Sequence, residues 1–176
     1  MNTTSIPGCR SGTYVLVFHA RGEHSVPIGR LGSLTTQPGY YLYVGSAFGP
    51  GGLAARIARH LTPSARRHWH IDHLKTVLTP AETVYSHDPG HLEHEWAQAL
   101  SRVPELSIAL PHFGASDCRC ASHLWFAATR TEVERAKHTL ASVSKHFETR
   151  NAATMARVPM ETGDAPRDYQ SHPDSR

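Results

Sequence analysis

Two tyrosines, an arginine and a histidine stand at spacings that suit phosphate chemistry. Tyr14 lies in the stretch Gly-Thr-Tyr and Tyr43 in the stretch Tyr-Val-Gly, and both belong to runs of β-branched and aromatic residues typical of strands. If these strands are antiparallel neighbours, the two phenols lie close, because opposed residues are about 5 Å apart. Arg56 and His60, four residues apart, are neighbours on one predicted helix. Taken alone, the tyrosines are better explained by ordinary strand packing.

Positive charge gathers between residues 56 and 75. The chain as a whole carries a net charge of +3, and this segment holds Asp72 as its single acid. Such a cluster attracts phosphate-bearing partners, although a solvated helix face explains it equally well. The basic residues and histidines of the segment are Arg56, Arg59, His60, Arg66, Arg67, His68, His70, His73 and Lys75.

A second group of side chains has the chemistry of a soft metal site. Cys118, Cys120 and His123 offer two sulfurs and one imidazole within six residues. Structural zinc takes four ligands, and His112 is the nearest spare donor in the sequence. The pattern is less specific than paired CxxC motifs, and a tight loop with packed or hydrogen-bonded cysteines is the favoured interpretation.

Composition excludes several classes of protein. The 176 residues suffice for one domain with a real core, and no apolar run approaches the roughly 20 residues that cross a bilayer. Three cysteines do not make a disulfide framework, and the N-terminus lacks the apolar segment of a signal peptide. We therefore expect a cytoplasmic protein that does not bind membranes.

Hydrophobic patterning predicts the elements that must position these side chains. Strands are expected at 13–18, 25–33 and 40–45, forming a small antiparallel meander, and again at 81–86 and 123–128. Helices are expected between Gly52 and Thr62, at 68–75, at 90–102 with Asp88 as N-cap, and at 131–145 with a Thr131–Glu134 capping box. The predicted organisation is a flexible segment 1–10, one domain 11–146 and a disordered tail 147–176.

The order of these motifs resembles the GIY-YIG nuclease superfamily. Gly-Thr-Tyr, Tyr-Val-Gly and then a helix with Arg56 and His60 carry the resemblance, which covers about residues 12–100. It implies an α+β domain, with a small central antiparallel sheet flanked by helices. It also implies an endonuclease that hydrolyses phosphodiester bonds in DNA with one divalent metal ion, Mg²⁺ or Mn²⁺.

The resemblance also implies roles for individual residues. Tyr14 would act in or near proton abstraction from the attacking water, and Tyr43 would hold the nucleophile or the phosphate. Arg56 would stabilise charge on the phosphoryl oxygens, and His60 stands where relatives carry a tyrosine or a histidine. Gly45 would let the backbone approach the substrate closely. The predicted substrate-binding residues are Gly45, Ser46, Arg59, Arg66, Arg67 and His70.

The metal ligand is expected to be a carboxylate, because Mg²⁺ prefers oxygen. Glu93 and Glu95 stand on the predicted helix at 90–102, and helical geometry does not choose between them. The superfamily pattern places a bulky apolar residue three positions after the acid. Glu93 with Trp96 fits this pattern, so the resemblance favours Glu93 as the metal ligand.

Two other functions remain open from the sequence. The first is a nucleic-acid-binding module without catalysis, in which the arginines contact backbone phosphates. The second is a structural partner protein whose Cys118–His123 loop binds zinc. With no separate recognition domain evident, recognition of DNA shape or of single strands is expected rather than of base sequence.

Overall fold

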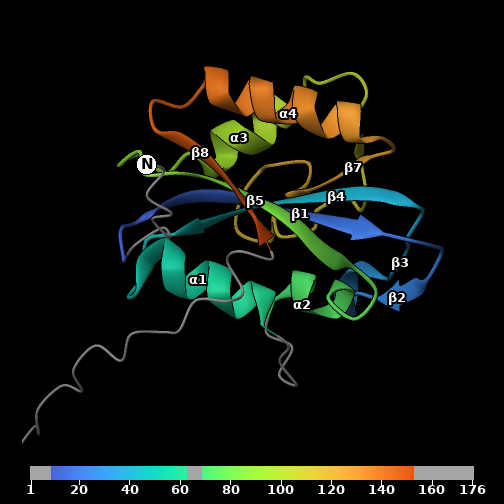
Figure 1. Ribbon diagram of the computed structural model, residues 1–176. Coiled ribbons are helices and arrows are strands. Elements are labelled where there is room, and N and C mark those ends of the chain that lie inside the picture. Colours follow the sequence, from blue (N-terminus) through green and yellow to red (C-terminus); the bar gives the residue numbers. More distant parts are fainter. Residues whose placement is uncertain (1–8, 63–68, 153–176) are drawn as a thin grey trace, which may run out of the picture.

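An antiparallel sheet of six strands forms the centre of the computed structural model, which describes residues 9–62 and 69–152 (Figure 1). The strand order is β6-β7-β4-β1-β5-β8, and every neighbouring pair is antiparallel. The central strands β1 and β4 carry the two predicted tyrosines. The strands of this sheet are β1 Gly12–Ala20, β4 Gly39–Ala47, β5 Thr79–Ser86, β6 Ser107–Ile108, β7 Leu124–Ala127 and β8 Phe147–Asn151.

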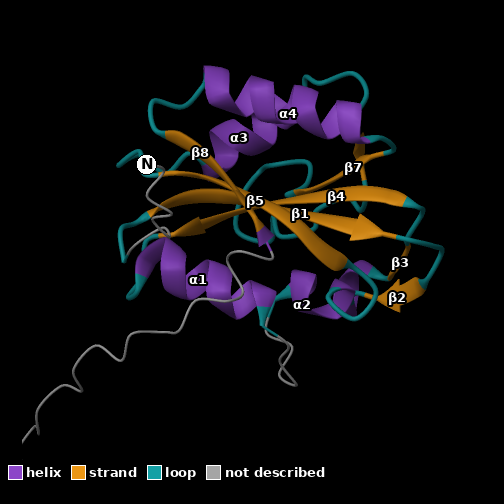
Figure 2. Ribbon diagram, viewed as in Figure 1, coloured by secondary structure: helices purple, strands orange, loops and turns teal. Residues whose placement is uncertain are grey.

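Helices cover both faces of this sheet. The pair α1 (Gly52–Leu61) and α2 (His70–Leu74) lies on one face, and α3 (Glu93–Leu100) and α4 (Arg130–Ser142) lie on the other (Figure 2). The predicted fold class, an α+β domain with a central antiparallel sheet flanked by helices, is therefore confirmed. Within the described residues, no helix is long and apolar enough to span a membrane.

Side chains along each strand alternate between the two faces of the sheet, so a separate hydrophobic core forms beneath each pair of helices. Leu16 and Phe18 of β1 pack in the cluster that includes Ile57 of α1. Val15 and Val17 point to the opposite face and share a cluster with Trp96 of α3. Successive side chains of a strand project to opposite faces, so an apolar run such as Tyr-Val-Leu-Val-Phe fills two cores at once.

The predicted three-strand meander is wrong in its connections. The segment expected as one strand at 25–33 contains β2 (Ser25–Pro27), a 3-10 turn (Gly29–Leu31) and the start of β3 (Ser33–Thr35). These two short strands pair only with each other, so the strands that flank β1 are β4 and β5. Pro27 lacks a backbone N–H, which suits the end of a short edge strand.

Two predicted helix starts are also wrong. Asp88 does not cap α3, which begins at Glu93. Its carboxylate instead accepts hydrogen bonds from the Ser86 hydroxyl at 2.9 Å and the Lys145 backbone N–H at 2.8 Å. The capping box of α4 joins Thr129 and Glu132 rather than Thr131 and Glu134. Both pairs fit the Thr-x-x-Glu pattern, because the sequence repeats it two residues later.

The prediction of a disordered tail from residue 147 is wrong for its first five residues. Residues 147–151 form β8, the edge strand that pairs with β5. The ring of Phe147 packs near Trp96, with 6.3 Å between centroids, and the Tyr85 hydroxyl donates to Glu148 at 2.8 Å. A polar strand with one anchoring aromatic gives little periodic signal. The rest of the predicted tail and residues 1–8 lie outside the described residues.

Candidate functional site

A polar pocket of about 440 Å³ opens where β1, β4, α1 and α3 approach one another. It collects most of the predicted site residues from positions far apart in the sequence. Arg59 lies outside its lining, and Arg66 and Arg67 lie outside the described residues. The lining residues are Tyr14, Tyr43, Gly45, Ser46, Arg56, His60, Trp69, His70, Glu93, Gly114, Ser116 and Asp117.

The two phenols meet diagonally rather than face to face. Tyr14 stands opposite Gly45 in the β1–β4 register, and Tyr43 stands opposite Leu16. A Cβ added at Gly45 would lie 2.5 Å from the Tyr14 hydroxyl, so the Tyr14 ring occupies the space that a larger residue would need. Gly45 is thus required by contact with Tyr14, a reason that differs from the close substrate approach implied by the resemblance.

Tyr14 is hydrogen-bonded to His60 inside the protein. Its hydroxyl lies 2.9 Å from Nε2 of His60, and both side chains are almost fully buried. Burial, and secondarily the nearby Tyr43, raises the pKa of Tyr14 well above its ordinary value. Burial lowers the pKa of His60 to about 4. At neutral pH the pair is therefore uncharged, and either the phenol or the imidazole can be the donor of this hydrogen bond.

Tyr43 lies on the same face of the sheet. Its ring centroid is 5.8 Å from that of His60 and 6.0 Å from that of Phe113, both in edge-on geometry. Burial, and after it the negative charge of Glu93, raises the pKa of the Tyr43 hydroxyl. Tyr43 is thus a neutral hydroxyl at the pocket wall.

Trp69 holds both predicted arginines in place. The Cζ atom of Arg56 lies 4.6 Å from its ring centroid, and that of Arg59 lies 3.9 Å from it. Such cation–π contacts hold a guanidinium in place while leaving its N–H donors free to turn towards an anion. Asp72 of α2 adds electrostatic attraction, because its carboxylate Oδ2 lies 3.9 Å from a guanidinium nitrogen of Arg59.

Glu93 brings a carboxylate from the opposite helical layer to this pocket. Its Oε2 accepts from the Ser46 hydroxyl at 2.5 Å, and its Oε1 lies 3.0 Å from Nδ1 of His123. Burial alone would raise the pKa of Glu93, but the hydrogen bonds from His123 and Ser46 outweigh it and lower the pKa. Glu95 is exposed and lines a different pocket, so it does not join Tyr14 and Tyr43.

The loop between β6 and β7, residues 109–123, forms another wall of the pocket. The backbone N–H of Gly114 donates to Nδ1 of His70 at 3.3 Å, and Phe113 packs against the same imidazole. Burial lowers the pKa of His70, followed by the effect of His73. Through the hydrogen bond from Gly114, His70 positions the loop, and it also lines the pocket.

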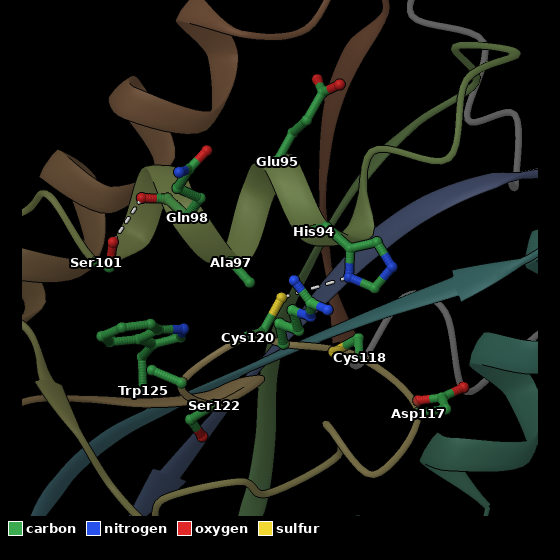
Figure 3. Close-up of a pocket in the computed structure, with 12 residues that line it drawn as sticks. His94, Glu95, Ala97, Gln98, Ser101, Asp117, Cys118, Cys120, Ser122 and Trp125 are labelled. Carbon is green, nitrogen blue, oxygen red and sulfur yellow. Dashed lines mark hydrogen bonds between the residues drawn. The ribbon is translucent and has the colours of Figure 1, made fainter.

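The fourth residue of the predicted cysteine–histidine group differs from the one that the sequence suggested. His94 of α3 lies beside Cys118, Cys120 and His123, and one donor atom from each of the four falls within 4.8 Å of all the others. Figure 3 shows His94 directed at Cys120 across a contact of 3.3 Å. His112, the donor nearest in sequence, is not part of this group. The cluster borders a second pocket of about 620 Å³.

Comparison with known proteins places residues 13–148 in a family described as a domain of unknown function, DUF123. The chain belongs to the DUF123 family. No curated protein and no solved structure matches it. The match covers β1 through the first residues of β8 of this DUF123 protein, so the pocket and the cysteine–histidine group both lie within the family domain.

The pocket of this DUF123 protein combines the groups that phosphoryl chemistry requires. A guanidinium faces two neutral phenols and a neutral imidazole, and an ionised carboxylate stands across from them. The carboxylate is a hard oxygen donor held by the Ser46 hydroxyl and by the nearby imidazole of His123, which suits a Mg²⁺ or Mn²⁺ ion that keeps several waters. The donor set at Glu93 therefore fits the ion that the resemblance implies.

Proposed function

We propose that this protein is a divalent-metal-dependent endonuclease that hydrolyses phosphodiester bonds in DNA. The observation that carries the proposal is the meeting of Tyr14, Tyr43, Arg56 and Glu93 around one pocket. Ordinary packing explains a buried tyrosine, but it does not explain an ionised carboxylate and a guanidinium converging on two phenols from separate layers.

In the proposed reaction, Tyr14 and His60 move the proton of the attacking water. As the water attacks phosphorus, its proton passes to the Tyr14 oxygen while the Tyr14 proton passes to Nε2 of His60. The bond from phosphorus to the leaving sugar oxygen breaks, this oxygen takes a proton from solvent water, and His60 afterwards returns its proton to solvent. This relay needs no tyrosinate in the free protein, which agrees with the raised pKa of Tyr14. The negative charge of Asp72 favours the protonated form of His60, whereas burial disfavours that form.

Arg56 and Tyr43 hold the phosphate in this proposal. The Arg56 guanidinium, stacked on Trp69, donates to the non-bridging oxygens as negative charge grows on them. The Tyr43 hydroxyl donates to the same phosphate or to the attacking water. Arg59, stacked beside Arg56 on Trp69, contacts a neighbouring backbone phosphate. These contacts carry no base information, so recognition is expected to be of backbone shape or of single strands.

Glu93 would hold the Mg²⁺ or Mn²⁺ ion. When bound, the ion supplies a positive charge against the developing phosphoryl charge. Ser46 and His123 fix the carboxylate on two sides and keep it ionised. Asp117, which also lines the pocket, is a second oxygen donor within the same space.

Cleavage of labelled single-stranded, duplex and flap DNA with Mg²⁺ or Mn²⁺ tests the proposal. Tyr14→Phe, Arg56→Ala and Glu93→Gln should each lower the cleavage rate by a hundredfold or more, about the contribution of one positioned proton-transfer or charge-stabilising group. Tyr40→Phe and Glu95→Gln are matched controls, because Tyr40 and Glu95 carry the same groups outside the pocket. Cleavage that persists unchanged in all three pocket variants would overturn the site assignment.

A nucleic-acid-binding module without catalysis is the second candidate. It is favoured by the stacking of Arg56 and Arg59 on Trp69, because guanidinium groups held in this way can contact backbone phosphates without any reaction. Binding that weakens steeply with salt, with no metal dependence and no cleavage of any substrate, would support it.

A further inference from the structure

Four soft donors gather at the base of the pocket-lining loop, outside the groups used in the proposed reaction. Cys118, Cys120 and His123 come from the end of the loop, and His94 comes from the first turn of α3. The Cys118 sulfur lies 3.5 Å from Nε2 of His123, and Nδ1 of His94 lies 3.3 Å from the Cys120 sulfur.

These separations match the edges of a tetrahedron around zinc. With Zn–S near 2.3 Å and Zn–N near 2.0–2.1 Å, neighbouring ligand atoms stand about 3.3–3.8 Å apart. These two contacts fall in this range, and all four donor atoms lie within 4.8 Å of one another, so that small side-chain movements would bring them around one ion. Two sulfurs with two imidazole nitrogens is a donor set that selects zinc over hard ions such as Mg²⁺.

The surroundings of His123 add an independent reason. Its Nε2 faces the sulfur cluster, while its Nδ1 lies 3.0 Å from Oε1 of Glu93. A metal-bound histidine ordinarily directs its other nitrogen at a carboxylate, which orients the ring and fixes its tautomer.

We propose that Cys118, Cys120, His123 and His94 bind one structural Zn²⁺ ion. All four positions are filled by protein, so the site is closed rather than catalytic. The ion ties the loop 109–123 to α3 and holds the His123 ring against Glu93. The proposal does not depend on nuclease activity, because zinc content is measured without any substrate.

Metal analysis of the purified full-length protein, freed of loosely bound ions with a weak chelator, tests the site. The expected result is one zinc per chain, and Co²⁺ in its place should give the visible absorption of a tetrahedral site with sulfur-to-cobalt charge transfer. A protein that holds no zinc after this treatment and gives no such spectrum overturns the proposal, whether its cysteines are free thiols or oxidised.

Variants identify the ligands. Cys120→Ser and His94→Ala should lose the ion to the chelator, whereas Cys9→Ser and His112→Gln should keep it, because neither control residue belongs to the cluster. His94 is exposed, so its replacement is compatible with folding, and circular dichroism checks this. His94→Cys should restore one zinc per chain. Full zinc retention in His94→Ala would overturn the four-ligand assignment.

Zinc binding and nuclease activity can be separated. Tyr14→Phe removes a proposed catalytic hydroxyl but neither a zinc donor nor the carboxylate that orients His123, so it should lose cleavage and keep zinc. Loss of zinc in Tyr14→Phe with a folded chain would contradict the separation of the two sites.

Discussion

At the scale of single residues, the position of Tyr14 depends on a missing side chain. Gly45 stands opposite Tyr14 across the β1–β4 pair, and the phenol lies over the space where a Cβ would be. The Tyr14 hydroxyl reaches His60 because this space is open. The Tyr-Val-Gly motif thus supplies one tyrosine and makes room for another.

Gly45→Ala should destabilise the fold and displace Tyr14. The added methyl meets the phenol at 2.5 Å, so we expect the free energy of unfolding to fall by about 1–3 kcal/mol, the usual cost of overpacking a core. Urea denaturation measures this change. Gly49→Ala is the matched control, since a Cβ there meets nothing within 4 Å. Equal stability of the two variants would contradict the role given to Gly45.

Burial of neutral His60 predicts a specific loss of stability in acid. Its pKa is about 4 in the folded protein and about 6.5 in an unfolded chain, so the unfolded chain takes up the proton first. The contribution of neutral His60 is complete above about pH 6.5 and is lost as pH falls towards 4. The expected loss at pH 5 is about 2 kcal/mol.

His60→Gln isolates this contribution, because all other titrating groups are shared with the wild type. Urea denaturation of both proteins at pH 7 and pH 5 gives the comparison. The wild type should lose more stability than the variant over this interval, and an identical loss in both would show that His60 does not titrate as expected.

At the scale of elements, β8 is the strand whose contribution is easiest to test. Phe147 covers Trp96, and the strand satisfies one edge of β5. A chain that ends at His146 should therefore have a clearly lower melting temperature than a chain that ends at Ala152. The difference between the two truncations isolates residues 147–152. Equal melting temperatures would mean that β8 adds nothing to the sheet.

Local patterns and motif order made most of the fold and most of the pocket lining predictable. The apolar runs of β1 and β4 and the four-residue stripe of α1 are strong periodic signals, and they placed Tyr14, Tyr43 and Arg56 correctly on their elements. The separate β2–β3 hairpin could not be inferred, because strand pairing depends on contacts that no single strand encodes.

Long-range contacts explain the residues that sequence reasoning missed. Trp69 contacts Arg56 and Arg59 only because α2 packs beside α1 on the same face of the sheet. His94 stands far from Cys118 in the sequence and is one of fourteen histidines, so no spacing distinguished it. Both residues become recognisable only when the layers are assembled.

At the scale of the whole molecule, the sheet divides the proposed site into two halves. The phenols and His60 belong to the layer of α1 and α2, and Glu93 belongs to the layer of α3 and α4. The two halves meet because β4 presents side chains to both: Tyr43 on one face, and Ser46, which holds Glu93, on the other.

Because β4 presents side chains to both faces, it limits insertions and deletions as well as substitutions. Three residue steps separate Tyr43 from Ser46, and an odd number of steps is what sends them to opposite faces. Val44 between them can be exchanged for another apolar residue at small cost. One added or deleted residue, however, would turn Tyr43 or Ser46 to the wrong face and part the phenols from the carboxylate. The length of this short segment is therefore constrained together with Gly45, whereas the identity of Val44 is not.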